Sequence, residues 1–164
     1  MIYLPVVNQK RLYSQLLLAE AQNFQNQPHL QRGLIEGALL HLNQARLFYL
    51  SEVAEMYQCP QPEAARTPKT LAEQLASISK FPAEANELVA LSEDKNSWYA
   101  QVTRCAQFLA LAPKRLNSSS ASLIKALDVD AEDAGPELSV ASLKAWLDSF
   151  VELVERHREV MVEC

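Results

Sequence analysis

Residues 29–57 read HLQRGLIEGALLHLNQARLFYLSEVAEMY, and this stretch decides the fold. Its apolar side chains recur every three or four residues, which is the spacing of one face of an α-helix. The face comprises Leu34, Ala38, Leu42, Ala45, Tyr49, Val53 and Met56, and it is flanked by Ile35, Leu39, Arg46 and Leu50. At a rise of about 1.5 Å per residue the helix would be roughly 40 Å long. We therefore expect it to be the central rod of a helical bundle.

The same spacing recurs at both ends of the chain. A first helix is predicted over residues 8–24 and a last helix over residues 139–162. The first carries a stripe that we expect to face the core, Leu12, Leu16 and Ala19, widened by Tyr13, Leu17 and Phe24. The inward face of the last comprises Leu143, Leu147, Phe150, Val154, His157 and Met161. Its other side carries the charge pairs Glu152/Arg156 and Glu155/Arg158, which are typical of a solvated helix face.

Three further helices are predicted between these. Thr67-Pro68 is typical of a helix N-cap followed by proline at the first helical position. A second short helix follows Phe81-Pro82, and Asn96 or Ser97 caps a longer one that ends at Pro113. The seam of that helix comprises Trp98, Val102, Cys105 and Leu109. The predicted fold class is all-α, an up-and-down bundle of four long helices plus two or three short ones. We expect one domain over residues 1–164, with a loop-rich acidic segment at about 117–138.

Composition and net charge argue against several classes of fold and function. The chain has three glycines and a net charge of −5, which argues against β-rich folds, glycine-rich phosphate loops and nucleic-acid binding. The most basic stretch, with Arg104, Lys114, Arg115 and Lys125, is thinly spread and is interpreted as a solvated helix end. The chain contains no run of about 18 apolar residues, so we predict no membrane span. Three cysteines without CxxC spacing, and no basic-then-apolar signal at the N-terminus, predict a cytoplasmic protein.

The sequence carries no signature of catalysis. None of the three histidines has glutamate three residues before it, as a di-metal bundle requires. The acidic residues 128–133 lack the glycine and glutamate of a calcium loop. Cys105 lies on an apolar seam and is expected to be inert core, whereas Cys59 borders a proline turn where a thiol can be exposed. We therefore predict no catalytic residue, no bound metal and no cofactor.

One polar cluster midway along residues 29–57 has two interpretations. It comprises His41, Gln44, Arg46 and Tyr49, with Trp98 and Tyr99 as candidate walls. Polar groups between large apolar neighbours cost free energy unless they are hydrogen-bonded. The structural interpretation pairs Arg46 with an acid on another helix, Glu20 or Glu52. The functional interpretation makes the cluster the polar floor of a cleft. We interpret His157 as a satisfied histidine at the core boundary.

The segment HLNQARLFYLSEVA at residues 41–54, followed by Ser97-Trp98-Tyr99, resembles an uncharacterised family of small helical proteins from Pseudomonas-like gamma-proteobacteria. The resemblance covers about the first two thirds of the chain and leaves out the tail after Asn117. It implies a helical fold and a bacterial cytoplasmic setting. It implies no activity, no catalytic residue and no ligand.

Two hypotheses of function follow. The first is a non-enzymatic binding or scaffold protein that uses helix faces against a second copy or another protein, because helices this broadly apolar must be covered on most sides. The alternative is a small-molecule binder or enzyme with an interhelical pocket near His41, Arg46 and Trp98. Neither hypothesis involves a nucleic acid or a membrane.

Overall fold

The computed structural model of the protein describes residues 1–111 and 137–162. These residues form α1 (Tyr3–Ala21), α2 (Pro28–Met56), α3 (Pro68–Ser77), α4 (Ala83–Glu93), α5 (Trp98–Ala110) and α6 (Val140–Val162), with 3-10 turns at Gln22–Phe24 and Pro62–Ala64. Neither described range contains a strand, which confirms the predicted all-α class. Among the described helices none is long and apolar enough to cross a membrane.

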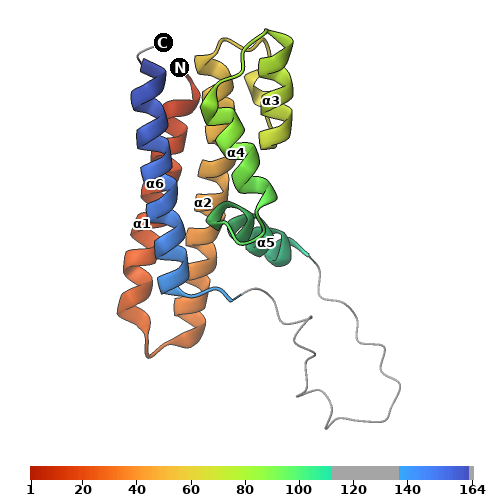
Figure 1. Ribbon diagram of the computed structural model, residues 1–164. Helices are drawn as coiled ribbons and strands as arrows, with labels where there is room; N and C mark the ends of the chain where they lie inside the picture. The colour runs from red at the N-terminus through yellow and green to blue at the C-terminus, as the bar shows by residue number, and fades with distance from the viewer. Residues whose placement is uncertain (112–136, 163–164) are drawn as a thin grey trace, which may run out of the picture.

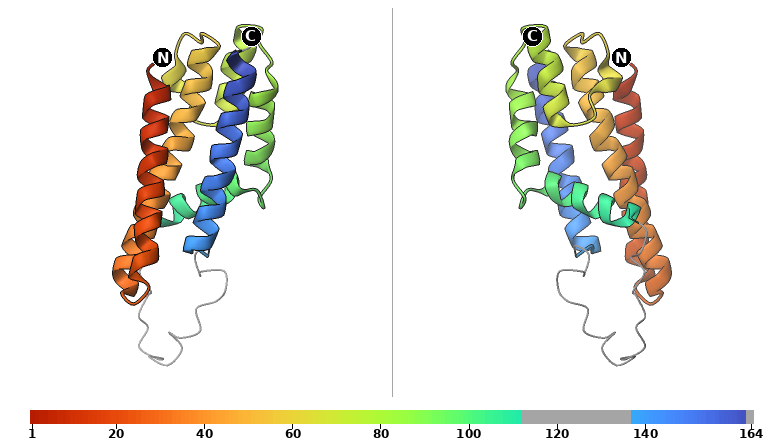
Figure 2. Two further views of the ribbon diagram at one scale, coloured as in Figure 1. Left: turned by 90° about the vertical axis from the view of Figure 1, so that its left-hand side faces the viewer. Right: turned by 90° about the vertical axis from the view of Figure 1, so that its right-hand side faces the viewer.

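The long helices α1, α2 and α6 run side by side, and α3 and α4 lie beside α2 (Figure 1). The predicted fourth long helix is α5, which has 13 residues and lies across the long helices instead of along them (Figure 2). Ser97 caps it as predicted, since its hydroxyl accepts a hydrogen bond from the Ala100 N–H at 3.0 Å. The predicted seam residue Leu109 is 38% exposed, because the crossing angle carries the end of α5 away from the core.

α1 and α2 form a tight antiparallel pair because small residues face each other between them. The Ser14 hydroxyl donates to the Ala38 carbonyl oxygen at 2.9 Å. A Cβ at Gly37 would lie 3.2 Å from the Leu17 Cδ1, so a larger residue there would require the Leu17 side chain to shift. Close helix contact of this kind maximises dispersion contacts between the two backbones.

The buried face of α1 differs from the prediction. Val7, Ser14, Leu18 and Ala21 are buried at 0–3% exposure. The predicted stripe points outward instead, with Leu12 49% and Leu16 58% exposed. α1 has apolar residues on two faces, and the face with the smaller side chains is the one that permits the close contact with α2. The outward stripe is therefore left uncovered by the described residues.

α1 also begins five residues earlier than the predicted start at Asn8. Pro5 lies in the first turn, where a helix needs no N–H donor and tolerates proline. The free N–H groups of Ile2 and Tyr3 donate to the Glu55 carboxylate at 2.7–3.2 Å. A carboxylate of α2 thus takes the place of a local cap and complements the positive end of the helix dipole.

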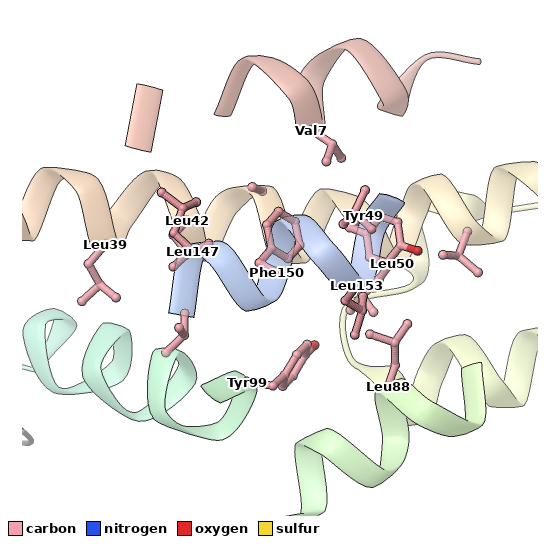
Figure 3. Close-up of a cluster of buried hydrophobic side chains, with 14 of the residues drawn as sticks. Val7, Leu39, Leu42, Tyr49, Leu50, Leu88, Tyr99, Leu147, Phe150 and Leu153 are labelled. Carbon is pink, nitrogen blue, oxygen red and sulfur yellow. The ribbon is translucent and has the colours of Figure 1, made fainter. Parts of the chain in front are cut away.

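The core lies between α2 and α6, where both predicted faces are confirmed. In α2 the seam from Ala38 to Val53 is 0–1% exposed, and all six predicted inward residues of α6 are 7% exposed or less. Figure 3 shows Phe150 of α6 between Leu42 and Tyr49 of α2. Each Å² of apolar surface buried in this way contributes about 25 cal/mol to stability.

The charged side of α6 is used differently from the prediction. The pair Glu152–Arg156 forms at 3.2 Å, but Glu155 and Arg158 do not pair with each other. Glu155 binds Arg11 of α1 at 3.1 Å, and Arg158 binds Glu52 of α2 at 2.7 Å. Both side chains reach neighbouring helices because α6 is flanked by α1 and α2 at this end. These two ion pairs therefore connect α6 to α1 and to α2.

The predicted polar turn at residues 117–120, the helical turn near residues 123–127 and the acidic segment to residue 138 lie almost entirely outside the described residues. Leu138, at the described end of that segment, is 9% exposed and packs against the core. The single domain over residues 1–164 stays a prediction.

Candidate functional site

Arg46 and Tyr99 come together where α5 crosses α2. The guanidinium carbon of Arg46 lies 4.4 Å from the centre of the Tyr99 ring, within the range of a cation–π contact. Arg46 is 5% exposed and Tyr99 is 1% exposed. Figure 3 shows Tyr99 directed from α5 toward the interior. A buried cation on an aromatic face is thus held by packing from two helices.

Both groups keep unused hydrogen-bond donors. Arg46 Nη2 donates to the Asn43 Oδ1 at 2.7 Å, and within the described part of the chain Arg46 forms no ion pair. The Arg46 Nε and the Tyr99 hydroxyl are buried and have no hydrogen-bond partner among the described residues. A buried donor without a partner costs about 1–3 kcal/mol, so each one requires an explanation.

These two residues form the floor of a cleft of about 440 Å³. Its lining comprises Arg46, Leu47, Arg66, Thr67, Pro68, Lys69, Ser92, Tyr99, Ala100, Thr103, Arg104 and Gln107. Arg66, Lys69 and Arg104 are exposed at the rim, and none of them pairs with a carboxylate of the described residues. The lining therefore brings four positive charges together and includes no acidic residue. This positive cluster stands out in a chain whose net charge is −5.

The local structure of each element explains this arrangement. Thr67 caps α3, accepting a hydrogen bond from the Thr70 N–H at 3.1 Å, which fixes Lys69 in the first turn. Thr67, Pro68 and Lys69 therefore present the positive end of the α3 dipole to the cleft. On α5, Tyr99, Thr103 and Gln107 follow each other at intervals of four residues and share one side of the helix, and Arg104 is next to Thr103.

The Tyr99 hydroxyl is a stable proton donor in this setting. Burial raises the pKa of Tyr99, and the nearby positive charge of Arg46 offsets only part of that rise. The hydroxyl consequently stays protonated near neutral pH and can donate a hydrogen bond to an acceptor in the cleft.

The structure divides the predicted cluster among three sides of α2. Arg46 and Tyr99 share the cleft. His41 faces α1, where its ring lies edge-on to Tyr13 with the ring centroids 5.3 Å apart. Burial, and then the charge of Lys10, lowers the pKa of His41. His41 Nδ1 and Gln44 Oε1 are also buried without a partner among the described residues, but they do not line the cleft.

Tyr49 belongs to a hydrogen-bonded chain on the α6 side. Its hydroxyl lies 2.9 Å from the His157 Nδ1, and the His157 Nε2 lies 2.9 Å from the Glu87 carboxylate. Arg156 donates twice to the same carboxylate at 2.7 and 2.9 Å. Burial strongly raises the pKa of Tyr49, so its hydroxyl stays protonated within this chain. His157 is thus a satisfied buried histidine, as interpreted from the sequence.

Two expected placements are corrected. Arg46 pairs with neither Glu20 nor Glu52, because Arg158 occupies Glu52 and because α5, facing Arg46, offers an aromatic ring in place of an acid. Trp98 packs on Phe150 with ring centroids 6.0 Å apart and does not line the cleft.

Both cysteines of the described residues are buried. Cys59, which the sequence left open to exposure, is 6% exposed, and Cys105 is 2% exposed. Burial raises the pKa of both thiols, which disfavours the reactive thiolate. In the two described ranges, no group of three or more histidine, cysteine or acidic residues is placed to hold a metal ion.

The fold and the cleft define the class of this molecule, an all-α protein with a positively charged interhelical cleft. The chain belongs to the family of unknown function DUF6586, whose model matches residues 4–164. The match includes the residues after Asn117, which the resemblance had left out. No curated protein and no solved structure matches the chain.

Sequence reasoning missed most of the cleft's charge. Arg104 was interpreted as part of a solvated helix end, and Arg66 and Lys69 were not considered. The available signal was their position on either side of the Thr67-Pro68 cap, where two cations accompany the positive end of a helix.

Proposed function

We propose that this protein is a non-enzymatic binding protein of the bacterial cytoplasm that holds an anionic small molecule in the Arg46 cleft. The observation that carries the proposal is a buried arginine with no acidic partner among the described residues, beside a buried tyrosine hydroxyl with no acceptor. An anion supplies the missing charge and the missing acceptors together. The cleft of about 440 Å³ is open to solvent, so a small anion can reach the buried donors.

The lining favours binding over catalysis. Among the described lining residues there is no histidine, carboxylate or thiol to act as a general base or nucleophile. The Tyr99 hydroxyl is held protonated, which suits a hydrogen-bond donor and not a base. The cleft offers fixed positive charge and fixed donors, and these recognise an anion without moving protons.

Thermal unfolding in the presence of single anions tests this proposal. Phosphate, sulfate, acetate and citrate are each added at constant ionic strength, and the melting temperature is measured. A bound anion at about ten times its Kd stabilises the protein by about 1.4 kcal/mol, which raises the Tm by roughly 3–6 °C. The increase is expected to be lost in Arg46→Gln and kept in Lys95→Gln, which removes an exposed cation outside the cleft. If no anion raises the Tm of the unaltered protein, the proposal is wrong.

A second candidate function is self-association through α1. It is supported by the outward stripe of Leu12, Leu16 and Ala19, all of which are exposed. A contiguous apolar surface on a helix is a common basis for contact with another subunit, and two copies of one stripe can pack around a twofold axis. This is the first of the two hypotheses drawn from the sequence.

Light scattering after size-exclusion chromatography tests the second candidate. The unaltered protein is expected to be dimeric at about 100 µM, a concentration at which micromolar association is complete. Leu16→Glu should give a monomer, whereas Val160→Glu should not, since Val160 is an exposed apolar residue (49%) that lies on α6. A monomer mass for the unaltered protein contradicts self-association and leaves the anion proposal untouched.

A further inference from the structure

The number of positive charges in the cleft indicates the charge of its ligand. Arg46, Arg66, Lys69 and Arg104 come from three separate segments, and no acidic residue of the described chain lies among the lining. A carboxylate carries one negative charge and would leave most of this positive charge uncompensated. We infer that the ligand is a phosphomonoester, a small molecule with a doubly charged phosphate group. The inference rests on the proposed function of the cleft.

The donors of the cleft come from separate segments, and a tetrahedral group offers oxygens to several of them. At the floor, the Arg46 Nε and the Tyr99 hydroxyl are free donors from α2 and α5. At the rim, the side chains of Arg66 and Lys69 come from the start of α3, and that of Arg104 from α5. A phosphomonoester has three terminal oxygens that point in different directions, whereas a carboxylate has two in one plane. Donors on several sides of the cleft can satisfy three oxygens at once.

The N-terminus of α3 adds to this preference. Thr67, Pro68 and Lys69 line the cleft, and α3 has ten residues. The positive end of a helix dipole stabilises phosphate groups in many proteins. A doubly charged group gains about twice as much from that potential as a singly charged one.

The remaining lining residues indicate the chemistry of the rest of the ligand, which is called its body here. Leu47, Pro68 and Ala100 are apolar, and the cleft volume of about 440 Å³ exceeds the space that a phosphate group needs. The hydroxyls of Ser92 and Thr103 already donate to backbone carbonyls at 2.7 and 2.9 Å, so they are left with lone pairs that accept. The body is therefore small, and it can place apolar atoms and a hydroxyl group against these walls.

Three probes that share one body test the inference by isothermal titration calorimetry. They are phenyl phosphate, phenyl sulfate and benzoate, at a pH of about 7.5, where only the first carries two negative charges. We expect phenyl phosphate to bind at least about tenfold more tightly than the other two, because its second negative charge strengthens the charged hydrogen bonds that its oxygens accept. Equal binding of all three would overturn the phosphate inference and leave the proposed function intact. No binding of any probe would overturn both.

The pH dependence gives an independent readout. The second ionisation of a phosphomonoester lies near pH 6. Lysine and arginine keep their charge between pH 5 and 7.5, and no histidine or carboxylate is among the described lining residues. The affinity for phenyl phosphate should therefore fall about tenfold between pH 7.5 and 5, whereas that for phenyl sulfate should stay constant. A parallel fall for both probes would overturn the inference, because it would trace the change to the protein.

Rim variants test the site without endangering the fold. Lys69 and Arg104 are exposed, so Lys69→Gln and Arg104→Gln should leave the Tm unchanged. Each should weaken phenyl phosphate binding by about three- to tenfold and phenyl sulfate binding by less. Tyr99→Phe removes only the floor hydroxyl and should weaken phosphate binding by a similar factor. Lys95→Gln should change nothing. If the rim variants bind phenyl phosphate as well as the unaltered protein does, the phosphate lies elsewhere and the inference fails.

Discussion

The ion pair between Glu52 and Arg158 gives the sharpest test of how this core is held together. Glu52 is completely buried, and it accepts hydrogen bonds from the Arg158 Nε at 2.7 Å and Nη2 at 2.8 Å. Arg158 has a side chain that is 19% exposed, and it also donates to the Asn8 Oδ1 at 2.9 Å. The carboxylate has no route to water, whereas the guanidinium has one. The two single substitutions should therefore differ in cost.

Arg158→Met leaves a buried carboxylate without the cation that binds it, which costs about 3–5 kcal/mol of unfolding free energy. Glu52→Met leaves an arginine that can turn toward solvent and keep its bond to Asn8, so it should cost only about 1–2 kcal/mol. The double variant buries two apolar side chains of similar volume. It should return to within about 1 kcal/mol of the unaltered protein.

Urea unfolding followed by far-ultraviolet circular dichroism measures the four free energies of this cycle. Lys144 and Asp148 supply the control, because their pair at 2.6 Å on α6 has side chains that are 58% and 63% exposed. The coupling free energy of that control pair should be below about 0.5 kcal/mol. Equal costs for Glu52→Met and Arg158→Met would refute the reasoning from burial. A double variant as unstable as Arg158→Met would refute it as well.

Three further predictions follow from burial and charge. Leu18→Ala should cost about 2–5 kcal/mol of unfolding free energy, because Leu18 is 3% exposed, whereas Leu16→Ala should cost less than about 0.5 kcal/mol, because Leu16 is 58% exposed. Similar costs in urea unfolding would contradict the observed buried face of α1. The arginine beside Glu87 lowers the pKa of that carboxyl from 4.5 to about 2, and its bond with His157 adds to the effect. A depressed pKa contributes stability that is present above pH 4.5 and is lost as the pH falls toward 2. The unfolding free energy of the unaltered protein should therefore exceed that of Glu87→Gln by about 1 kcal/mol at pH 7, a value reduced for solvent screening, and the difference should vanish near pH 2. A difference that is independent of pH would show that the carboxyl is not held ionised. Cys59 and Cys105 should react with iodoacetamide in a Cys164→Ser variant only at the rate of local or global opening, because both thiols are buried; rapid labelling of the native protein would contradict that burial.

The sequence predicted α2 and α6 well because their apolar positions form one face each. A single stripe leaves one way to bury the helix, and the seam from Ala38 to Val53 is buried as expected. α1 carries two candidate stripes. Hydrophobicity alone favoured the one with Leu12 and Leu16, but the structure buries the one with Ser14, which allows closer contact with α2. The choice depended on the shape of the partner helix, which periodicity does not contain.

The candidate site was predictable only in part, for a related reason. A polar residue in the middle of an apolar helix is visible in the sequence, and Arg46 was singled out in that way. The position of Tyr99 over its guanidinium depends on α5 crossing α2 at a steep angle, and an up-and-down arrangement did not anticipate that crossing. The rim cations Arg66 and Lys69 belong to a loop and a first helical turn, where charge is common and carries little weight by itself.

At Arg46, the side chain that stability favours differs from the side chain that an anion site requires. At Glu52 the fold pairs a buried charge with a cation, Arg158. At Arg46 the fold buries a cation, gives it one neutral acceptor and an aromatic face, and leaves one of its donors unused. Stability alone favours an apolar residue of the same length at that position. A protein departs from the rules of its own core mainly where function requires it. Because the same cleft adds three more cations and a second unused donor, the simplest physical account is an anion that satisfies all of them at once.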